Sequence, residues 1–134
     1  MKYILDTNIC IYIIKKQPAA VILRLTQTPI QDIAISVITY SELEYGVSKS
    51  QHQTRNKIAL MEFLAPFTIL PYDEIAGEKY GEIRADLERK GTTIGNMDML
   101  IASHTLTSDR TLVTNNEKEF NRIPDLKVEN WSKS

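Results

Sequence analysis

The chain contains a single cysteine, Cys10, among its 134 residues. One cysteine excludes an intrachain disulfide and a zinc site built from several cysteines. This usage is typical of a reducing cytoplasm, where we expect the protein to act. Glycine and proline number only 5 each, which argues against an all-β protein rich in tight turns.

The sequence also lacks a strong net charge and a long apolar run. Its 16 basic and 17 acidic residues give a formal net charge of −1, whereas proteins that coat nucleic acid passively are usually strongly basic. The apolar run Ile9–Ile14 is far shorter than the ~20 residues that a membrane span requires, and the N-terminus has no signal-peptide layout. We therefore expect no association with a membrane.

Short apolar runs alternate with longer stretches of helical periodicity. The runs 3–5, 33–35, 67–70 and 111–113 predict strands, and 126–128 predicts a weak fifth strand. Short apolar strands that alternate with helices indicate a parallel sheet covered on both faces, with right-handed crossovers. We therefore predict one domain over the whole chain, with a three-layer α/β architecture and a mainly parallel sheet.

The helical stretches have recognisable ends. In the stretch 73–90, acidic residues come first, Ile83 and Leu87 fall on one stripe, and Gly91 follows the last turn, as expected for a helix that ends in a left-handed glycine. Pro18 fits the start of another helix. Helices are predicted at 7–16, 19–26, 37–48, 55–64, 73–90 and 97–106.

Carboxylate or amide side chains follow three of the predicted strands. Asp6 comes directly after the first strand, Glu42 six residues after the end of the second, and Asn115 and Asn116 just after the fourth. Asp98 lies in the first turn of the helix that precedes the fourth strand. Because ligands bind beyond the carboxyl ends of parallel strands, we expect these groups to converge on one cleft.

A convergence of carboxylates has a chemical meaning. Like charges held together repel and raise their own pKa values, so such clusters are typical of cation sites. Oxygen ligands without histidine or cysteine favour a hard cation, Mg²⁺ or Mn²⁺. An ion held by a few carboxylates can polarise a phosphate and activate water. The pattern therefore predicts a metal site equipped for phosphodiester hydrolysis, with Asp6, Glu42 and Asp98 among its candidate ligands.

Each acidic residue also fits a structural role. Asp6 fits a helix N-cap, and Thr39 with Glu42 fits a capping box. Asp98 near a helix N-terminus is explained by the helix dipole alone, and Glu119 by a solvated surface charge. The hypothesis of a metal site therefore depends on the acidic residues occurring together at this spacing.

Other residues have mainly structural interpretations. Thr7 and Ser36 fit the capping of a following turn better than the orientation of water or phosphate. His104 fits a partly buried structural role better than catalysis, and Trp131 fits packing. Arg110 could contact RNA phosphates, although a solvated face is the default for one arginine.

Four segments carry a family resemblance. Residues 4–8 read ILDTN, residues 35–46 read ISVITYSELEYG, residues 95–102 read GNMDMLIA, and residues 112–120 read LVTNNEKEF. In this order and spacing they resemble PIN-domain ribonucleases, and more narrowly the VapC toxins of bacterial type II toxin–antitoxin modules. The resemblance covers almost the whole chain and implies a single PIN domain over residues 1–134.

The resemblance also carries expectations about function. It implies Mg²⁺-dependent endoribonuclease activity, inhibition by a VapB antitoxin, and a homodimer. For the group found in enteric and related bacteria, it suggests cleavage of initiator tRNA in the anticodon stem-loop. Asp6, Glu42 and Asp98 match the positions of the metal-binding catalytic acids.

The fourth acidic position departs from the family pattern. Many PIN domains have an aspartate shortly after the position of Thr114, where this chain has Asn115 and Asn116. Glu119 is the nearest carboxylate that could serve as the fourth catalytic acid. This departure affects the expected binding of a second metal ion more than it affects the expected activity.

Three rival functions fit part of the pattern. A receiver-type signalling domain would require a phosphoacceptor aspartate after the third strand, where the residues are Leu70–Tyr72. A haloacid-dehalogenase-like phosphatase would require a second aspartate at the position of Asn8. A non-catalytic PIN-like binding module has no need of the three acids, and an RNase assay with and without EDTA separates it from an enzyme.

Overall fold

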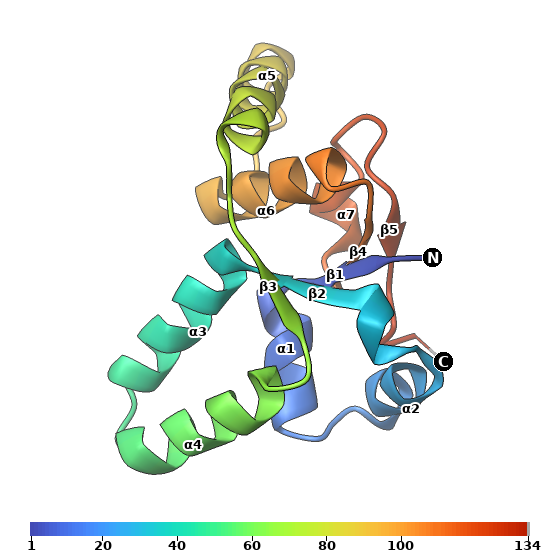
Figure 1. Ribbon diagram of the computed structural model, residues 1–134. Helices are drawn as coiled ribbons and strands as arrows, with labels where there is room; N and C mark the ends of the chain where they lie inside the picture. The colour runs from blue at the N-terminus through green and yellow to red at the C-terminus, as the bar shows by residue number, and fades with distance from the viewer. Residues whose placement is uncertain (134) are drawn as a thin grey trace.

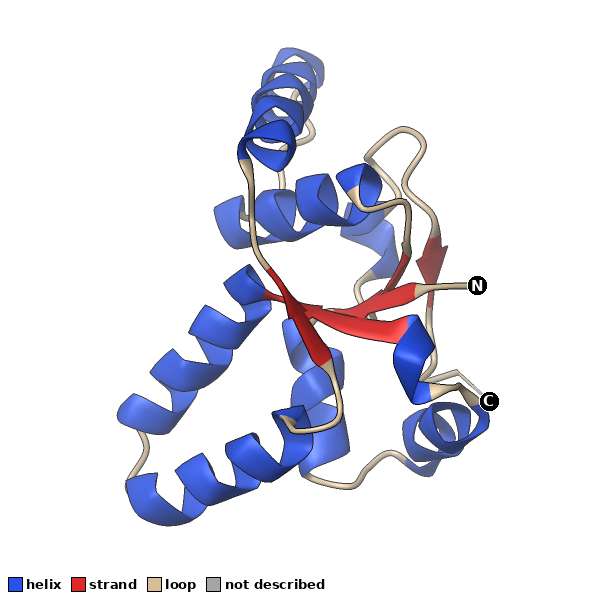
Figure 2. Ribbon diagram, in the orientation of Figure 1, coloured by secondary structure: helices blue, strands red, loops and turns tan. Residues whose placement is uncertain are grey.

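Five parallel strands form one sheet in the order β3-β2-β1-β4-β5 (Figures 1 and 2). The central strand β1 (Tyr3–Leu5) lies between β2 (Ile33–Ser36) and β4 (Thr111–Val113), and the edges are β3 (Thr68–Leu70) and β5 (Val128–Glu129). The structure is a computed structural model that describes residues 1–133.

Helices cover both faces of the sheet. In Figure 1, α1 to α4 lie on one side of the strands and α5 to α7 on the other. The helices are α1 (Thr7–Ile14), α2 (Ala19–Gln27), α3 (Val37–Ser48), α4 (Gln53–Leu64), α5 (Glu74–Lys90), α6 (Asn96–Thr107) and α7 (Glu117–Phe120), with a 3₁₀ turn η1 (Ile30–Asp32) before β2.

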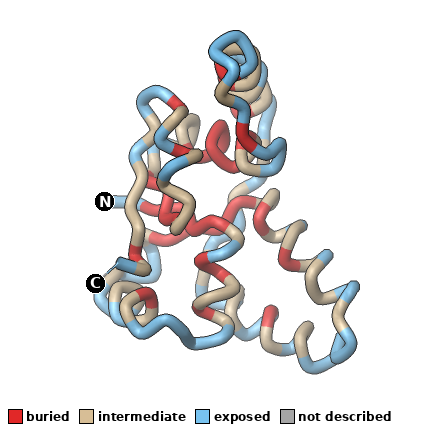
Figure 3. Tube along the Cα trace, turned by 180° about the vertical axis from the view of Figure 1, so that it is seen from behind, coloured by how far each residue is buried: buried red, intermediate tan, exposed pale blue. Residues whose placement is uncertain are grey.

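Side-chain alternation along β1 divides the core into two parts. Leu5 packs with Ile9 of α1 in the core on the α1–α4 side. Ile4 points to the opposite face and packs with Met99 and Ile101 of α6. Successive strand residues point to opposite faces of a sheet, so a strand covered by helices on both sides must be apolar throughout. Figure 3 shows the buried residues concentrated along these strands.

The strand order places a topological switch point between β1 and β4. From β1 the chain proceeds to β2 and β3 on one side, and then returns to the other side for β4 and β5. At such a point two connections leave the sheet in opposite directions, which opens a crevice at the carboxyl ends of the strands. Asp6 follows β1 and Thr114 follows β4, so both lie at this crevice.

The predicted α/β class and parallel sheet are confirmed, whereas some boundaries were wrong. β5 begins at Val128 because the chain first passes through a turn in which Asp125 has a φ of 68°. Helix α4 begins at Gln53 rather than at residue 55, and η1 and α7 were not predicted. Within residues 1–133, no helix has the length and apolar character needed to cross a membrane.

Candidate active site

Asp6 lies at the switch point and is only 5% exposed. Its Oδ1 accepts a hydrogen bond from the Ile9 backbone N–H at 2.9 Å, so Asp6 is the N-cap of α1. Its Oδ2 accepts a hydrogen bond from the hydroxyl of Thr114, which directly follows β4. The structural N-cap role therefore coincides with a position in the crevice, and the side chain is held both by α1 and by the residue that follows β4.

Burial raises the pKa of Asp6 to about 6. Loss of water is the largest cause, because desolvation penalises the charged form. The hydrogen bonds from Thr114 and Ile9 act in the opposite direction, while the negative charges of Asp98 and Glu42 raise the pKa further. The fold thus brings these two carboxylates close enough to influence Asp6.

Glu42 is held by a hydrogen bond from α1. The Thr7 hydroxyl donates to Glu42 Oε1 at 2.6 Å. Helix α3 begins after Ser36, whose hydroxyl accepts from the Ile38 N–H at 3.1 Å. Thr39 therefore lies inside the helix, and the alternative in which Thr39 and Glu42 form a capping box is wrong.

Asp98 lies in the first turn of α6 and is partly exposed. Burial is the largest cause of its raised pKa, followed by the negative charges of Glu119 and Glu42. Helix α6 has Gly95 at its N-cap, which provides no side-chain capping bond. The Asp98 carboxylate therefore lies within electrostatic range of both Glu42 and Glu119.

The fourth position is occupied by an amide and a carboxylate that are bonded to each other. Asn116 Nδ2 donates to Glu119 Oε2 at 3.0 Å, and the Asn116 backbone N–H donates to Thr114 Oγ1 at 2.9 Å. Because the Thr114 hydroxyl donates to Asp6, these bonds connect Asp6 with Glu119. Asn115 points elsewhere, since its Nδ2 donates to Tyr12 OH at 2.6 Å.

Comparison with known proteins identifies the family. The PIN domain family model matches residues 3–126. Ribonuclease VapC2 of Rickettsia felis is 48% identical over 134 residues, which cover 99% of this chain and 100% of the relative. The tRNA(fMet)-specific endonuclease VapC of Shigella flexneri is 41% identical over 132 residues, which cover 98% of this chain and 99% of the relative. The chain belongs to the PIN-domain family, in its VapC group.

Solved VapC-containing structures have the same fold as this PIN domain. VapBC2 from Rickettsia felis, bound to a DNA fragment from their promoter, matches with a TM-score of 0.90 and 47% identity, covering 98% of this chain and 99% of that chain. DNA-bound VapBC from Salmonella typhimurium matches with a TM-score of 0.92 and 40% identity, covering 98% of both chains. The resemblance predicted from the four segments is confirmed.

The acids of this PIN domain are electrostatic neighbours, but they do not form a preassembled metal cage. Within residues 1–133, no three side chains of His, Cys, Asp or Glu are arranged to hold an ion as they lie. The donor types nevertheless suit a hard cation, because the candidate ligands Asp6, Glu42 and Asp98 are all carboxylates. Besides burial, the negative charges of neighbouring carboxylates raise the pKa values of Asp6 and Asp98, and a cation would relieve this repulsion.

Two hydroxyl groups at the site were underestimated from the sequence. Thr7 was expected to cap a turn, yet its hydroxyl bonds Glu42. In the sequence, Thr114 belongs to the segment 112–120 with no partner indicated, yet its hydroxyl donates to Asp6 in the structure. The signal for Thr114 was its place directly after a buried strand, but its partner depends on the strand order.

The remaining expectations concern structural residues. His104 is 4% exposed with its Nδ1 2.7 Å from Ser36 Oγ, which confirms a buried structural position. Ser36 caps α3 as predicted. Trp131 is fully buried, which confirms packing. Arg110 was expected on a solvated face, which is wrong, because Nη1 donates to the Tyr3 carbonyl at 3.2 Å.

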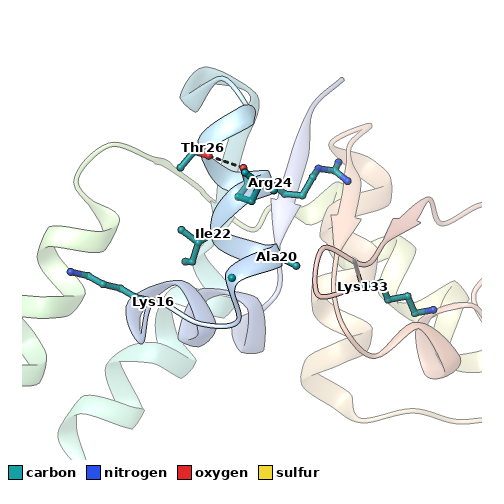
Figure 4. Close-up of a pocket in the computed structure, with 8 residues that line it drawn as sticks. Lys16, Ala20, Ile22, Arg24, Thr26 and Lys133 are labelled. Atoms are coloured by element: carbon teal, nitrogen blue, oxygen red, sulfur yellow. Dashed lines mark hydrogen bonds between the residues drawn. The ribbon is translucent and has the colours of Figure 1, made fainter.

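Two surface hollows differ in their relation to the acids. A hollow of about 300 Å³ among α1, α3 and α4 has Glu42 in its lining. A hollow of about 980 Å³ lies along α2, where Figure 4 shows Lys16, Arg24 and Lys133 around Ile22. The described residues that line this second hollow include no carboxylate. It is therefore separate from the candidate active site.

Proposed function

We propose that this PIN domain, extending over residues 1–134, is a metal-dependent endoribonuclease. Asp6, Glu42 and Asp98 would bind Mg²⁺ or Mn²⁺, and Glu119 would act as the fourth acid. The grouping of the acids carries the proposal: in addition to burial, the charges of Asp98 and Glu42 raise the pKa of Asp6, and those of Glu119 and Glu42 raise the pKa of Asp98. A hard cation is the ligand that resolves such repulsion between carboxylates.

The chain's own residues would hold the acids in place for this chemistry. A bound divalent ion would supply Lewis acidity towards the phosphate and lower the pKa of a coordinated water. Thr114 and the Ile9 N–H fix Asp6, and Thr7 fixes one oxygen of Glu42. Asn116 fixes one oxygen of Glu119. Each acid with such a partner is oriented before substrate binds, which lowers the reorganisation needed during reaction.

The names of the relatives support a substrate class and a partner. The Shigella flexneri relative is a tRNA(fMet)-specific endonuclease, and we propose tRNA as the substrate, with initiator tRNA cut in the anticodon stem-loop. The solved VapBC complexes support a VapB-type antitoxin as the protein partner. We further propose a homodimer that acts in the cytoplasm, where its substrate resides.

Sequencing of RNA 5′ ends after brief expression in bacteria tests activity and substrate together. We expect new 5′-phosphate ends in the anticodon stem-loop of initiator tRNA, and none with Asp98→Asn. Scattered ends in messenger RNA would contradict the proposed substrate. Identical ends with wild type and Asp98→Asn would contradict the nuclease function and would favour a non-catalytic binding module.

The metal requirement can be tested on the purified protein. We expect EDTA to stop cleavage of the same RNA and added Mg²⁺ or Mn²⁺ to restore it. Cleavage that continues unchanged in excess EDTA would contradict the proposed cofactor.

A further inference from the structure

A buried histidine connects the two helices that carry Glu42 and Asp98. His104 belongs to α6, the helix with Asp98 in its first turn. Its Nδ1 lies 2.7 Å from Ser36 Oγ, and Ser36 is both the last residue of β2 and the N-cap of α3. Glu42 is in the second turn of α3. The imidazole therefore joins α6 to the point from which α3 departs.

The hydrogen bonds around the ring agree on one tautomer. Nδ1 faces the Ser36 hydroxyl and the Pro71 backbone contacts the ring, so we assign the ring proton to Nε2. Nδ1 then accepts from the Ser36 hydroxyl, whose oxygen accepts from the Ile38 N–H at 3.1 Å. An imidazole with one donor and one acceptor nitrogen satisfies both contacts.

The ring is also fixed by packing. Tyr72 lies edge-on to His104, with centroids 5.4 Å apart and an interplanar angle of 75°. The Tyr72 hydroxyl is 2.9 Å from Ser103 Oγ on α6 and donates to the Ala76 carbonyl at 3.1 Å. At 4% exposure, the imidazole has little room to change its rotamer. The ring can therefore hold Ser36 at a fixed position relative to α6.

We infer that His104 is a positioning residue for the proposed metal site, because its bond to Ser36 fixes the N-terminus of α3 relative to α6 and thereby sets Glu42 against Asp98. The inference rests on the proposed function. Glu42 lies within two helical turns of Ser36 on α3, and Asp98 within two turns of His104 on α6. Because a helix is a regular, stiff element, a shift of α3 at Ser36 would move Glu42 as well. The negative charge of Glu42 already raises the pKa of Asp98, which places the two carboxylates within electrostatic reach.

A purely structural histidine would support the core without affecting metal affinity, and variants separate the two roles. His104→Phe fills the volume and removes both polar contacts. His104→Asn places an amide near the position of Nδ1 and can keep the Ser36 bond, whereas His104→Gln reaches towards Pro71. Thr105→Val is the matched control, since Thr105 is buried on the same helix and its hydroxyl donates to the Ile101 carbonyl at 2.8 Å.

The experiment titrates the full-length variants with Mn²⁺ alone and measures the free ion by electron paramagnetic resonance. Thermal unfolding of each variant accompanies the titration. We expect His104→Phe and His104→Gln to bind Mn²⁺ roughly tenfold more weakly, as is typical when the support of a metal ligand is removed. His104→Asn and Thr105→Val should bind as wild type does, whatever their melting temperatures.

The outcomes distinguish this inference from the proposed function. Asp98→Asn should lose the Mn²⁺ site. If it does, while His104→Phe binds as wild type does, the positioning role is wrong and the metal site stands. If Asp98→Asn keeps wild-type affinity, both proposals fail. Should His104→Phe not fold, equal affinities of His104→Asn and His104→Gln would overturn the positioning role.

Discussion

The buried carboxylate of Asp6 has a cost for the metal-free protein. Its pKa in the folded state is about 6, against an ordinary value of 3.8, chiefly because of burial. The folded state thus binds this proton more tightly than the unfolded chain does. The stabilisation of the folded state by this bound proton is fully present below about pH 4 and is lost as the pH rises through about 6.

Asp6→Asn should therefore stabilise the metal-free protein at pH 7 while abolishing cleavage. The amide keeps the acceptor for the Ile9 N–H and carries no charge. A pKa shift of this size corresponds to at most about 3 kcal/mol. Urea unfolding in EDTA at pH 7 and pH 4.5 measures the effect. The free energy of unfolding of Asp6→Asn should exceed that of wild type at pH 7, and this difference should shrink at pH 4.5. An equal difference at both pH values would show that it does not come from the buried charge of Asp6.

Thr7 offers a second test at the residue scale. Its hydroxyl donates to Glu42 Oε1 at 2.6 Å, so Thr7→Val removes the group that orients this acid and keeps the side-chain shape. We expect RNA cleavage to fall by about tenfold or more, as for other groups that support a ligand. Thr7→Ser retains the hydroxyl and should retain most activity. Equal rates for the Val and Ser variants would show that the bond has no part in the reaction.

At the scale of single elements, the cap of α5 predicts an effect on stability alone. Asp73 Oδ1 accepts from the Ala76 N–H at 3.0 Å, and Gly91 ends this helix with a φ of 68°. Asp73→Ala should lower the free energy of unfolding by about 1 kcal/mol, because a capping acceptor is lost. Asp73→Ser should recover most of it. Urea unfolding measures the change, and a matching loss of cleavage would contradict a role confined to the cap.

The elements with strong local signals were predictable from the sequence. Helix α5 has a capping aspartate, an apolar stripe and a terminal glycine, and its predicted span nearly matches Glu74–Lys90. Helix α7 and the turn η1 contain only 4 and 3 residues, too few to show a helical period. Ser36 and Thr39 both fit an N-cap, and the extended backbone of Ser36 at the end of β2 decides between them.

At the scale of the whole molecule, the sequence predicted the class of fold but not the strand order. Parallel pairing joins segments far apart in the chain, so local periodicity does not report it. The order puts β4 next to β1, and this brings Thr114 to Asp6 across 108 positions. The acids were identifiable from their place after strands, whereas their hydroxyl partners required the assembled sheet.

Only the assembled fold allows Asp6, Asp98 and Glu42 to share one divalent ion, as we propose. Crystals of the protein soaked in Mn²⁺ and measured at an anomalous wavelength would locate the ion directly. We expect one strong peak bonded to oxygens of Asp6 and Asp98, with Glu42 reached directly or through water, and no such peak in Asp98→Asn. Strong peaks only at other positions would contradict a shared ion.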